Sequence, residues 1–312
     1  MVRLKDIANY LNLSVTTVSY SLNNDSRIPE STRLKVINAA AELGYKGKSG
    51  QSHSSDKYMR QVVLCLNGVK GEIFTEIIDS MQKTLNLHNC ELLLYSGRNI
   101  SKLKWLDGVV VLNSRITNAE LETITARRIP VVLMDREEHV NNAVHVILDN
   151  FNGCRETTLN AINAGAKTFA FIGGPRESYE SQKRYEGFCA ALAESKLDSI
   201  ELVLQTDFTF EGGLNACRFL LERDNLPDAI ICGNDETAMG IIEGLKQGKA
   251  LKHVIITGFD GTTPSEPIRY VTAKADHKHW GTTAAYSMIQ LFEHAPSVQD
   301  IKLPVSLIEY NT

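Results

Sequence analysis

The sequence contains no long apolar run and no cysteine pairing motif. None of its apolar stretches approaches the roughly 18 residues of a membrane span. The residues from Met1 to Lys5 are charged and lack the apolar segment of a secretion signal. The six cysteines are scattered without a C-x-x-C pair, which favours reduced packing residues over a disulfide framework. We therefore expect a cytoplasmic protein without a membrane partner.

The sequence also lacks the motifs of common enzyme classes. No G-x-G-x-x-G follows an expected strand, and neither a G-x-x-x-x-G-K-[ST] loop nor a G-x-S-x-G elbow is present. His277 and His279 lie two apart without an accompanying metal-ligand set, so we interpret them as exposed or cleft-edge residues. We expect no enzymatic activity, no cofactor and no bound metal. The alternative is a sugar-processing enzyme, or a plain binding protein, with an additional N-terminal segment. Turnover assays would distinguish an enzyme from a protein that only binds.

The charge is unevenly distributed along the chain. The 312 residues are 43% hydrophobic and 22% charged, which is typical of a globular protein with about two domains and a small extra module. The net charge is −4, yet residues 1–60 contain nine Lys and Arg against five Asp and Glu, a net charge of +4. The remaining residues therefore carry −8. A basic N-terminal segment on an acidic body indicates that this segment meets a polyanion.

The first 45 residues have the pattern of a small helical domain. Apolar residues spaced i, i+3, i+4 and i+7 from Leu4 predict a short helix that ends before Asn12, a residue that tolerates a sharp turn. Ser14 is a suitable N-cap for a second helix over Val15–Leu22, with Val18 and the last leucine facing inward. Two short helices joined by a three-residue turn are typical of a helix-turn-helix.

A third helix and a polar linker complete the N-terminal region. The segment 29–31 begins the helix and Gly44 ends it. Residues 46–55 contain no apolar side chain, which predicts a solvated, flexible linker. We therefore divide this region into a head over residues 1–45 and a hinge over 46–60. The inner face of the third helix is expected to carry Leu34, Ile37, Ala40 and Ala41.

From residue 61 onward, short apolar runs alternate with helical patterns. Such runs of Val, Ile and Leu predict an α/β fold with parallel sheets covered by helices on both faces. Nine strands suit two doubly wound halves, so we expect a core over 61–312 with lobe one at about 61–147 and 277–304, and lobe two at about 148–276 and 305–312. The expected strands are Val62–Leu66, Glu91–Tyr95, Gly108–Leu112, Pro130–Met134, Val144–Leu148, Phe169–Ile172, Glu201–Leu204, Ala229–Cys232 and Val254–Thr257.

Polar residues follow several of these strands. Asp135-Arg136, Gly233-Asn234-Asp235 and Gly258-Phe259-Asp260 each come at or near a strand end, and Arg184 lies beyond another. Ligands of doubly wound folds bind outside the carboxyl ends of the strands. Acids, an amide and a guanidinium that converge there can bind vicinal hydroxyls, and Phe74 and Phe208 can cover a sugar ring. The alternative is that Asn234 and Asp260 only cap the elements that follow them.

Several segments of the sequence resemble those of a known family. The segments 2–8 (VRLKDIA) and 13–23 (LSVTTVSYSLN) are similar to the head of the LacI/GalR family of bacterial repressors. The similarity continues through Thr32-Arg33 and through segments at 41–45, 130–136, 184–188, 234–240 and 258–260. The resemblance implies a dimeric repressor that binds operator DNA. It also implies a two-lobed core like a periplasmic binding protein, which senses a small molecule such as a sugar or a nucleobase.

The resemblance also assigns roles to individual residues. Val15, Thr16 and Tyr20 fall where the family contacts bases in the major groove, on the outward side of the second helix. Ser14, Thr17, Asn23 and Tyr45 match positions that usually contact phosphates. The effector-pocket positions of the family correspond to Ile73, Phe74, Asp135, Arg184, Phe208, Asn234 and Asp260.

The effector class follows from one further position. Relatives that respond to purines carry an arginine where Ser178 stands here, so its absence favours a sugar or sugar phosphate as the effector. Control by a partner protein, or by a nucleobase or nucleoside, stays open as an alternative. In each case the expected regulator is a homodimer on a double-stranded, pseudo-palindromic operator.

Three departures from the family pattern are visible. Asn12 replaces the usual glycine of the turn, and the stretch between Tyr95 and Gly108 is shorter by roughly a helix, leaving 101–106 as a stub. The hinge lacks the family's arginine and its leucine wedge, whose position is taken by Ser54. A serine cannot offset the few kcal/mol that unstacking a base step costs. We therefore expect mainly electrostatic hinge contacts through Lys46 and Lys48, and a weakly bent operator. The alternative is that Tyr58 or Met59 supplies a displaced wedge.

Overall fold

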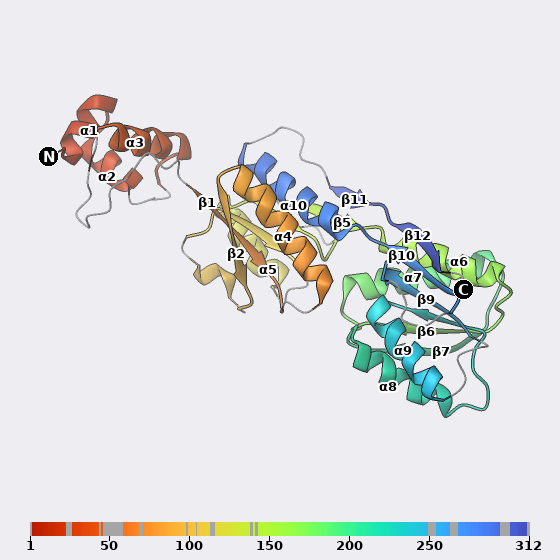
Figure 1. The fold of residues 1–312 in the computed structure, drawn as a ribbon. Coiled ribbons are helices and arrows are strands. Elements are labelled where there is room, and N and C mark those ends of the chain that lie inside the picture. Colours follow the sequence, from red (N-terminus) through yellow and green to blue (C-terminus); the bar gives the residue numbers. More distant parts are fainter. Residues whose placement is uncertain are drawn as a thin grey trace. The chain divides into compact units, whose positions relative to one another are not determined.

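The computed structural model describes residues 2–22, 27–43, 45, 59–68, 71–97, 99–103, 105–112, 116–137, 140, 143–248, 254–262, 268–293 and 300–310. The chain forms two compact units, residues 1–61 with 86–91, and residues 62–85 with 92–312. The first contains a helical head and the second contains two α/β sheets (Figure 1). The predictions for Asn23 and for hinge residues 46–58 lie outside the described residues. No helix among the described residues is long and apolar enough to cross a membrane.

Three helices form the head: α1 Leu4–Leu11, α2 Val15–Leu22 and α3 Glu30–Glu42. The predicted turn is confirmed, because Asn12 ends α1 in the left-handed conformation with φ 54°. The predicted N-cap is also confirmed, since the Ser14 hydroxyl accepts a 3.0 Å hydrogen bond from the amide of Thr17. The buried core of the head consists of Ile7, Ala8, Val18, Val36, Ala39 and Ala40.

The expected inner face of the third helix is partly wrong. Ala40 is buried as predicted, but Ile37 is only half-buried, and Val36 and Ala39 take the inner positions. The side chains of Leu34 and Ala41 lie outside the described residues. Two sets of apolar residues with helical spacing overlap in this helix, so periodicity alone could not decide which set faces the core.

The first sheet contains six strands in the order β11-β5-β4-β3-β1-β2. Helix α10 (His277–Phe292) contacts β3, β4 and β5, and α4 (Glu72–Leu87) packs on α10, because Gly281 approaches the backbone of Ile77. Helix α5 (Asn118–Ala126) packs on the face that carries Val63 and Val109. The strands are β1 Arg60–Cys65, β2 Cys90–Tyr95, β3 Gly108–Val111, β4 Val131–Leu133, β5 Ala143–Leu148 and β11 Ile301–Leu303.

The second sheet also contains six strands, in the order β12-β10-β9-β8-β6-β7. Helices α6 (Asn150–Asn163) and α7 (Tyr179–Glu194) cover one face, and α8 (Phe210–Leu221) and α9 (Asp235–Gln247) cover the other (Figure 1). Strand β12 is antiparallel to β10, whereas the other recorded pairs of this sheet are parallel. The strands are β6 Phe169–Gly173, β7 Ile200–Gln205, β8 Ala229–Cys232, β9 Ile255–Asp260, β10 Tyr270–Lys274 and β12 Ser306–Tyr310.

All nine predicted strands are present, but the described residues contain three further strands that the prediction missed. Strand β11 has only three residues, and β12 is an edge strand that alternates exposed and half-buried residues, so neither forms a continuous apolar run. Strand β9 continues to Asp260, so this residue is the last of its strand rather than part of a following loop. Between β2 and β3, the described residues form only the 3-10 turn Ile100–Lys102, in the segment expected to be short. All six cysteines are free thiols.

Candidate DNA-recognition surface and ligand site

The N-terminal part of α2 presents the residues predicted to contact bases. Val15 is 45% exposed, which packing within the head does not explain, and Thr16 beside it is exposed as well. The opposite face of α2 is buried through Val18 and Ser21. An exposed valine and threonine at a helix start can contact a thymine methyl and the edges of neighbouring bases. We call Ser14, Val15, Thr16, Thr17 and Tyr20 the recognition surface.

The residues predicted to contact phosphates lie in different surroundings. The hydroxyls of Ser14 and Thr17 lie 2.8 Å apart in a hydrogen bond, at the start of the helix. Tyr45 is half-buried and packs against the core of the head, while its amide donates to the carbonyl of Ala40 at 2.9 Å. Tyr45 therefore contributes to head packing in addition to any contact with DNA.

Arg27 is a residue that the sequence prediction missed. Its guanidinium carbon lies 4.3 Å from the centroid of the Tyr20 ring, within the range of a cation–π contact. The contact places a positive charge on the recognition surface, next to a residue predicted to contact bases. Arg27 lies beyond the end of α2, and no periodic signal in the sequence links it to that helix, so only the three-dimensional structure brings Arg27 and Tyr20 together.

Arg184 of α7 is the centre of the candidate ligand site in the second sheet. It is 5% exposed, and its Nε donates to Oδ1 of Asn150 at 2.9 Å. Nη1 donates to the carbonyl of Gly233 at 2.6 Å, and the guanidinium carbon lies 3.6 Å from the centroid of the Phe259 ring. These contacts fix the guanidinium in one orientation, which leaves Nη2 facing Asp260 at 4.0 Å from Oδ1.

Two predicted effector residues have unusual backbone conformations. Phe208 has φ 64° and Asp260 has φ 116°, although neither is a glycine. Such conformations cost of order 1–3 kcal/mol each and are concentrated at ligand sites. The Phe208 ring covers Gly174 and lies 5.8 Å from the guanidinium of Arg184. The strain therefore falls on two residues that flank the same arginine.

Asn234 caps a helix, as the alternative interpretation allowed. Its Oδ1 accepts from the amide of Thr237 at 3.1 Å at the start of α9, and its Nδ2 donates to the carbonyl of Phe208 at 2.9 Å. The second bond holds the backbone of Phe208 in place. One N–H of the amide group is then left for a ligand.

Asp235 holds the backbone that follows Asp260. Its carboxylate accepts hydrogen bonds from the amides of Gly261 and Thr262 and from the hydroxyls of Tyr270 and Thr272. Burial raises the pKa of Asp235 to about 7, with a further contribution from the charge of Asp260. This network was missed because its members come from three separate segments of the sequence.

Asp135 follows β4 as predicted, and a neighbouring arginine holds it. The Nε atom of Arg136 donates to Oδ1 of Asp135 at 2.9 Å, and Nη1 donates to the carbonyl of Ile116 at 2.9 Å. Asp135 also affects the start of α7. The pKa of Glu180 there is raised, first by burial and then by the charge of Asp135. Glu180 precedes Arg184 by about one turn of α7.

His277 belongs to the candidate site, which agrees with the cleft-edge alternative of the prediction and not with an exposed histidine. It is 6% exposed, and its Nε2 lies 3.7 Å from Oδ1 of Asp260. Its Nδ1 lies 4.0 Å from Oε2 of Glu76 on α4. A chain of polar groups therefore joins α4 and α10 to the end of β9. His279 is exposed, and no cluster of metal-ligating residues is found in the part of the chain that the structure describes.

The structure thus brings together four of the seven predicted effector residues. Arg184, Phe208, Asn234 and Asp260 contact one another directly or through one intervening residue. Ile73 and Phe74 lie half-buried in the first turn of α4, and among the described residues no hydrogen bond or ring contact joins them to those four. Asn150, which follows β5, was missed, although its place after a strand end was a usable signal.

A helix-turn-helix head joined to a two-sheet core with charged groups at its strand ends defines a regulator with a periplasmic-binding-protein-like core. Residues 3–47 match the family described as bacterial regulatory proteins of the lacI family. Residues 70–309 match the periplasmic binding proteins and sugar binding domain of the LacI family. The chain belongs to the LacI family, as its resemblance to that family predicted.

Curated relatives and solved structures agree with this family. Catabolite control protein A of Priestia megaterium is 27% identical over 283 residues, which cover 86% of this chain and 85% of that protein. The transcriptional repressor PurR of Klebsiella pneumoniae is 29% identical over 255 residues, or 78% of this chain and 75% of that protein. The lac repressor dimer bound to operator and the anti-inducer ONPF is 20% identical, with a TM-score of 0.72 over 100% of this chain and 99% of that chain.

Proposed function

We propose that this LacI-family protein is a cytoplasmic transcriptional repressor whose affinity for operator DNA is controlled by a sugar or sugar phosphate. One observation carries the proposal. The same chain contains a head with an exposed recognition surface and a core in which Phe208 and Asp260 both lie near the guanidinium of Arg184. The protein acts as a homodimer on a pseudo-palindromic operator, in keeping with the dimeric lac repressor that shares its fold.

The chemistry of the site supports a polyhydroxylated ligand. Arg184 offers Nη2 as a donor, and the carboxylate of Asp260 accepts no hydrogen bond from the described residues. Adjacent sugar hydroxyls can donate to the carboxylate and accept from the guanidinium at the same time. The Phe208 ring provides an apolar surface for the face of the sugar.

Control of DNA binding follows from contacts on both sheets. Asp260 ends β9 in the second sheet, whereas His277 and Glu76 come from helices that pack with the first. A ligand that binds Asp260 also contacts His277, which lies beside it. Such a ligand favours one arrangement of the two sheets over another and thereby shifts the population that fits the operator.

A nucleobase effector is the second candidate, because PurR repressors are among the relatives. One observation favours the sugar. The hydroxyl of Ser178, at the position where purine-responsive relatives carry an arginine, caps α7 by accepting from the amide of Ser181 at 3.2 Å. It also donates to Glu180 at 2.7 Å. The site therefore lacks a second guanidinium at this position to bind a purine.

A thermal-shift screen distinguishes these candidates. The full chain is heated with sugars, sugar phosphates, nucleobases and nucleosides, one at a time. A ligand present at about 100 times its Kd adds about 2.7 kcal/mol of stability, which is several degrees in the melting temperature. We expect a sugar or sugar phosphate to give the shift, and Asp260→Ala to abolish it. A shift given only by nucleobases or nucleosides would replace the sugar with a purine-type effector.

A salt titration tests the DNA-binding part separately. Duplexes selected from a random library are titrated with the full chain at increasing salt. Counterion release predicts that the logarithm of the binding constant falls linearly with the logarithm of salt concentration. A binding constant that does not change with salt concentration, or the absence of any selected sequence, would contradict the role of the head.

A further inference from the structure

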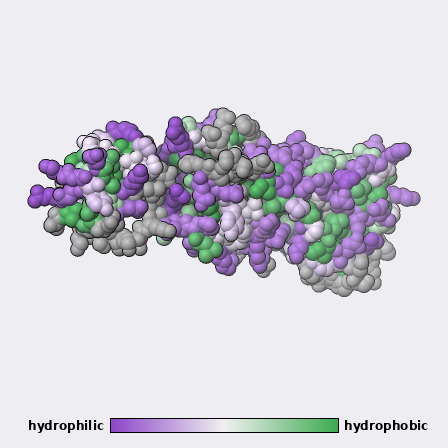
Figure 2. Space-filling model, turned by 90° about the horizontal axis from the view of Figure 1, so that it is seen from above, coloured by the Kyte–Doolittle hydropathy of each residue, from purple (hydrophilic) through white to green (hydrophobic). Residues whose placement is uncertain are grey.

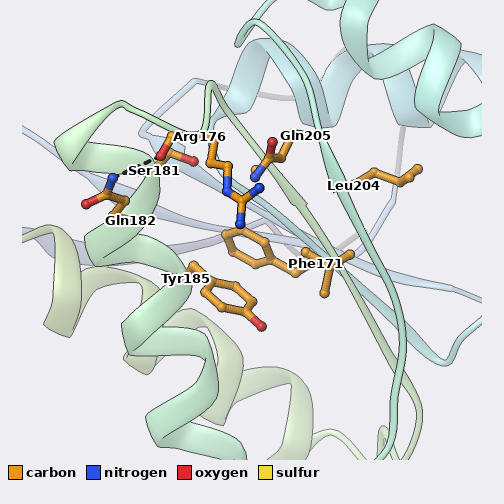
Figure 3. Close-up of a pocket in the computed structure, with 9 residues that line it drawn as sticks. Phe171, Arg176, Ser181, Gln182, Tyr185, Leu204 and Gln205 are labelled. Carbon is orange, nitrogen blue, oxygen red and sulfur yellow. Dashed lines mark hydrogen bonds between the residues drawn. The ribbon is translucent and has the colours of Figure 1, made fainter.

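A pocket of about 400 Å³ lies on the second sheet, and none of the seven predicted effector residues lines it. Its walls come from β6, β7 and the first half of α7 (Figure 3). Val203 of edge strand β7 is paired in register with Phe171 of β6, so their side chains share one face of the sheet. Helix α7 covers Phe171 but leaves Val203 43% exposed, which produces the hollow.

The floor of the pocket is aromatic. The rings of Phe171 and Tyr185 are 5.2 Å apart between centroids, and their planes are tilted by 60°. Phe171 is buried, whereas Tyr185 is 36% exposed and presents part of its ring to the opening. Two tilted rings with Val203 beside them form a surface suited to a flat ring of about the size of benzene.

One end of the pocket is polar and carries a positive charge. Figure 3 shows the side chain of Arg176 reaching toward the Phe171 ring, with Gln205 beside it. The guanidinium of Arg176 has no hydrogen bond or ion pair within the described part of the chain, and no carboxylate is among the residues that line the pocket. The Nε2 atom of Gln182 donates a hydrogen bond to the carbonyl of Arg176 at 2.9 Å and so fixes the backbone of this arginine.

We propose that this pocket is a second ligand site that binds a small aromatic carboxylate. The ring lies against Phe171 and Tyr185, and the carboxylate accepts hydrogen bonds from the guanidinium of Arg176 and the amide of Gln205. An arginine fork matches the two oxygens of a carboxylate, whereas a neutral amide of the same shape offers a weaker partner. The proposal goes beyond the proposed function, because it involves neither the Arg184–Asp260 site nor DNA.

Benzoate and benzamide are the probes, since they share one shape and differ in charge. Binding to the full chain is measured by saturation-transfer NMR titration without DNA or sugar. We expect benzoate to bind saturably with a Kd of about 1 mM, as suits so small a ligand, and benzamide to bind at least about fivefold more weakly. Arg176→Gln is expected to remove this preference by weakening benzoate about fivefold to tenfold while leaving benzamide unchanged.

Two further variants make the test specific to the pocket. Val203→Trp fills the hollow from an exposed position and is expected to weaken both probes at least about tenfold. Arg218→Gln removes an exposed arginine from α8 of the same sheet and is expected to change neither. The melting temperature of each variant verifies that it is folded. Benzoate that fails to bind at about 10 mM, or that binds Arg176→Gln as well as the wild type, overturns the proposal. So does a Val203→Trp variant that changes the oligomeric state in sedimentation, because a second copy of the chain would then occupy this face.

Discussion

The Nη2 atom of Arg184 lies 4.0 Å from Oδ1 of Asp260, and both side chains are at most 10% exposed. At this distance the two groups attract each other without a direct hydrogen bond, whose length would be about 3 Å. Each therefore keeps a donor or acceptor for a ligand, while the charge of one offsets the burial of the other.

We predict that these two charges are energetically coupled. Removing the cation in Arg184→Met leaves a buried carboxylate and should reduce the free energy of unfolding by about 3–5 kcal/mol. The double variant with Asp260→Asn should lose less than the sum of the single variants, by about 1–3 kcal/mol. Urea denaturation of the four proteins measures this coupling. Additive losses would mean that the pair does not interact in solution.

A second prediction concerns pH. Because the pKa of Asp235 is raised to about 7 in the folded protein, the native state retains a proton that the unfolded chain releases near pH 4. Stability from this group is therefore present at low pH and is lost as the pH rises through about 7. Asp235→Asn has no such titration, so its stability deficit relative to the wild type should be largest at about pH 5 and smaller at about pH 8. A deficit that grows with pH would contradict the raised pKa.

The contact between α6 and α7 provides a third prediction. A Cβ on Gly187 of α7 would lie 2.2 Å from the carbonyl oxygen of Phe151 on α6, a backbone atom that cannot rotate away. Gly187→Ala should therefore force the helices apart and reduce stability by about 1–3 kcal/mol. Gly68→Ala is the matched control, since nothing lies within 4 Å of its Cβ, and it should change stability by less than about 0.5 kcal/mol. Equal melting temperatures for both variants would refute the close helix contact.

A fourth prediction concerns DNA binding, where substitutions of Tyr20 and Arg27 should have different effects. Tyr20→Ala should relax the preferred sequence, by about 1–3 kcal/mol for a lost base contact. Arg27→Gln should weaken binding to all sequences and reduce the salt slope by about one, as for a lost phosphate contact. Binding-site selection and salt titration of each variant measure these effects. An unchanged consensus for Tyr20→Ala would show that the assigned recognition surface is wrong.

Local signals in the sequence predicted much of the fold. The bounds of α2 match the prediction because Ser14 at the start of the helix is a side-chain cap, a local feature. Strand β10 was missed because Thr272 and Lys274 interrupt its apolar residues, and its burial depends on neighbouring strands. The face of α3 was misassigned because two apolar sets with one spacing overlap there.

The candidate site was predictable where it follows strand ends and unpredictable where it depends on distant contacts. Arg184 and Asp260 lie in the segments 184–188 and 258–260 that resemble the family, and the structure places them together. The partners that orient them, Asn150 and Asp235, act through hydrogen bonds between separate segments. No periodicity reports such contacts, because they are set by packing of the sheet and its helices.

The central claim is that a ligand at Asp260 controls the binding of DNA by the head. The most direct test measures fluorescence anisotropy of a selected operator duplex, with and without the ligand from the thermal-shift screen, for the wild type and Asp260→Ala. We predict equal operator affinity without ligand, a ligand-dependent change of about fivefold or more in the wild type, and no change in the variant. A ligand that alters the operator affinity of both proteins equally, or of neither, would contradict this claim.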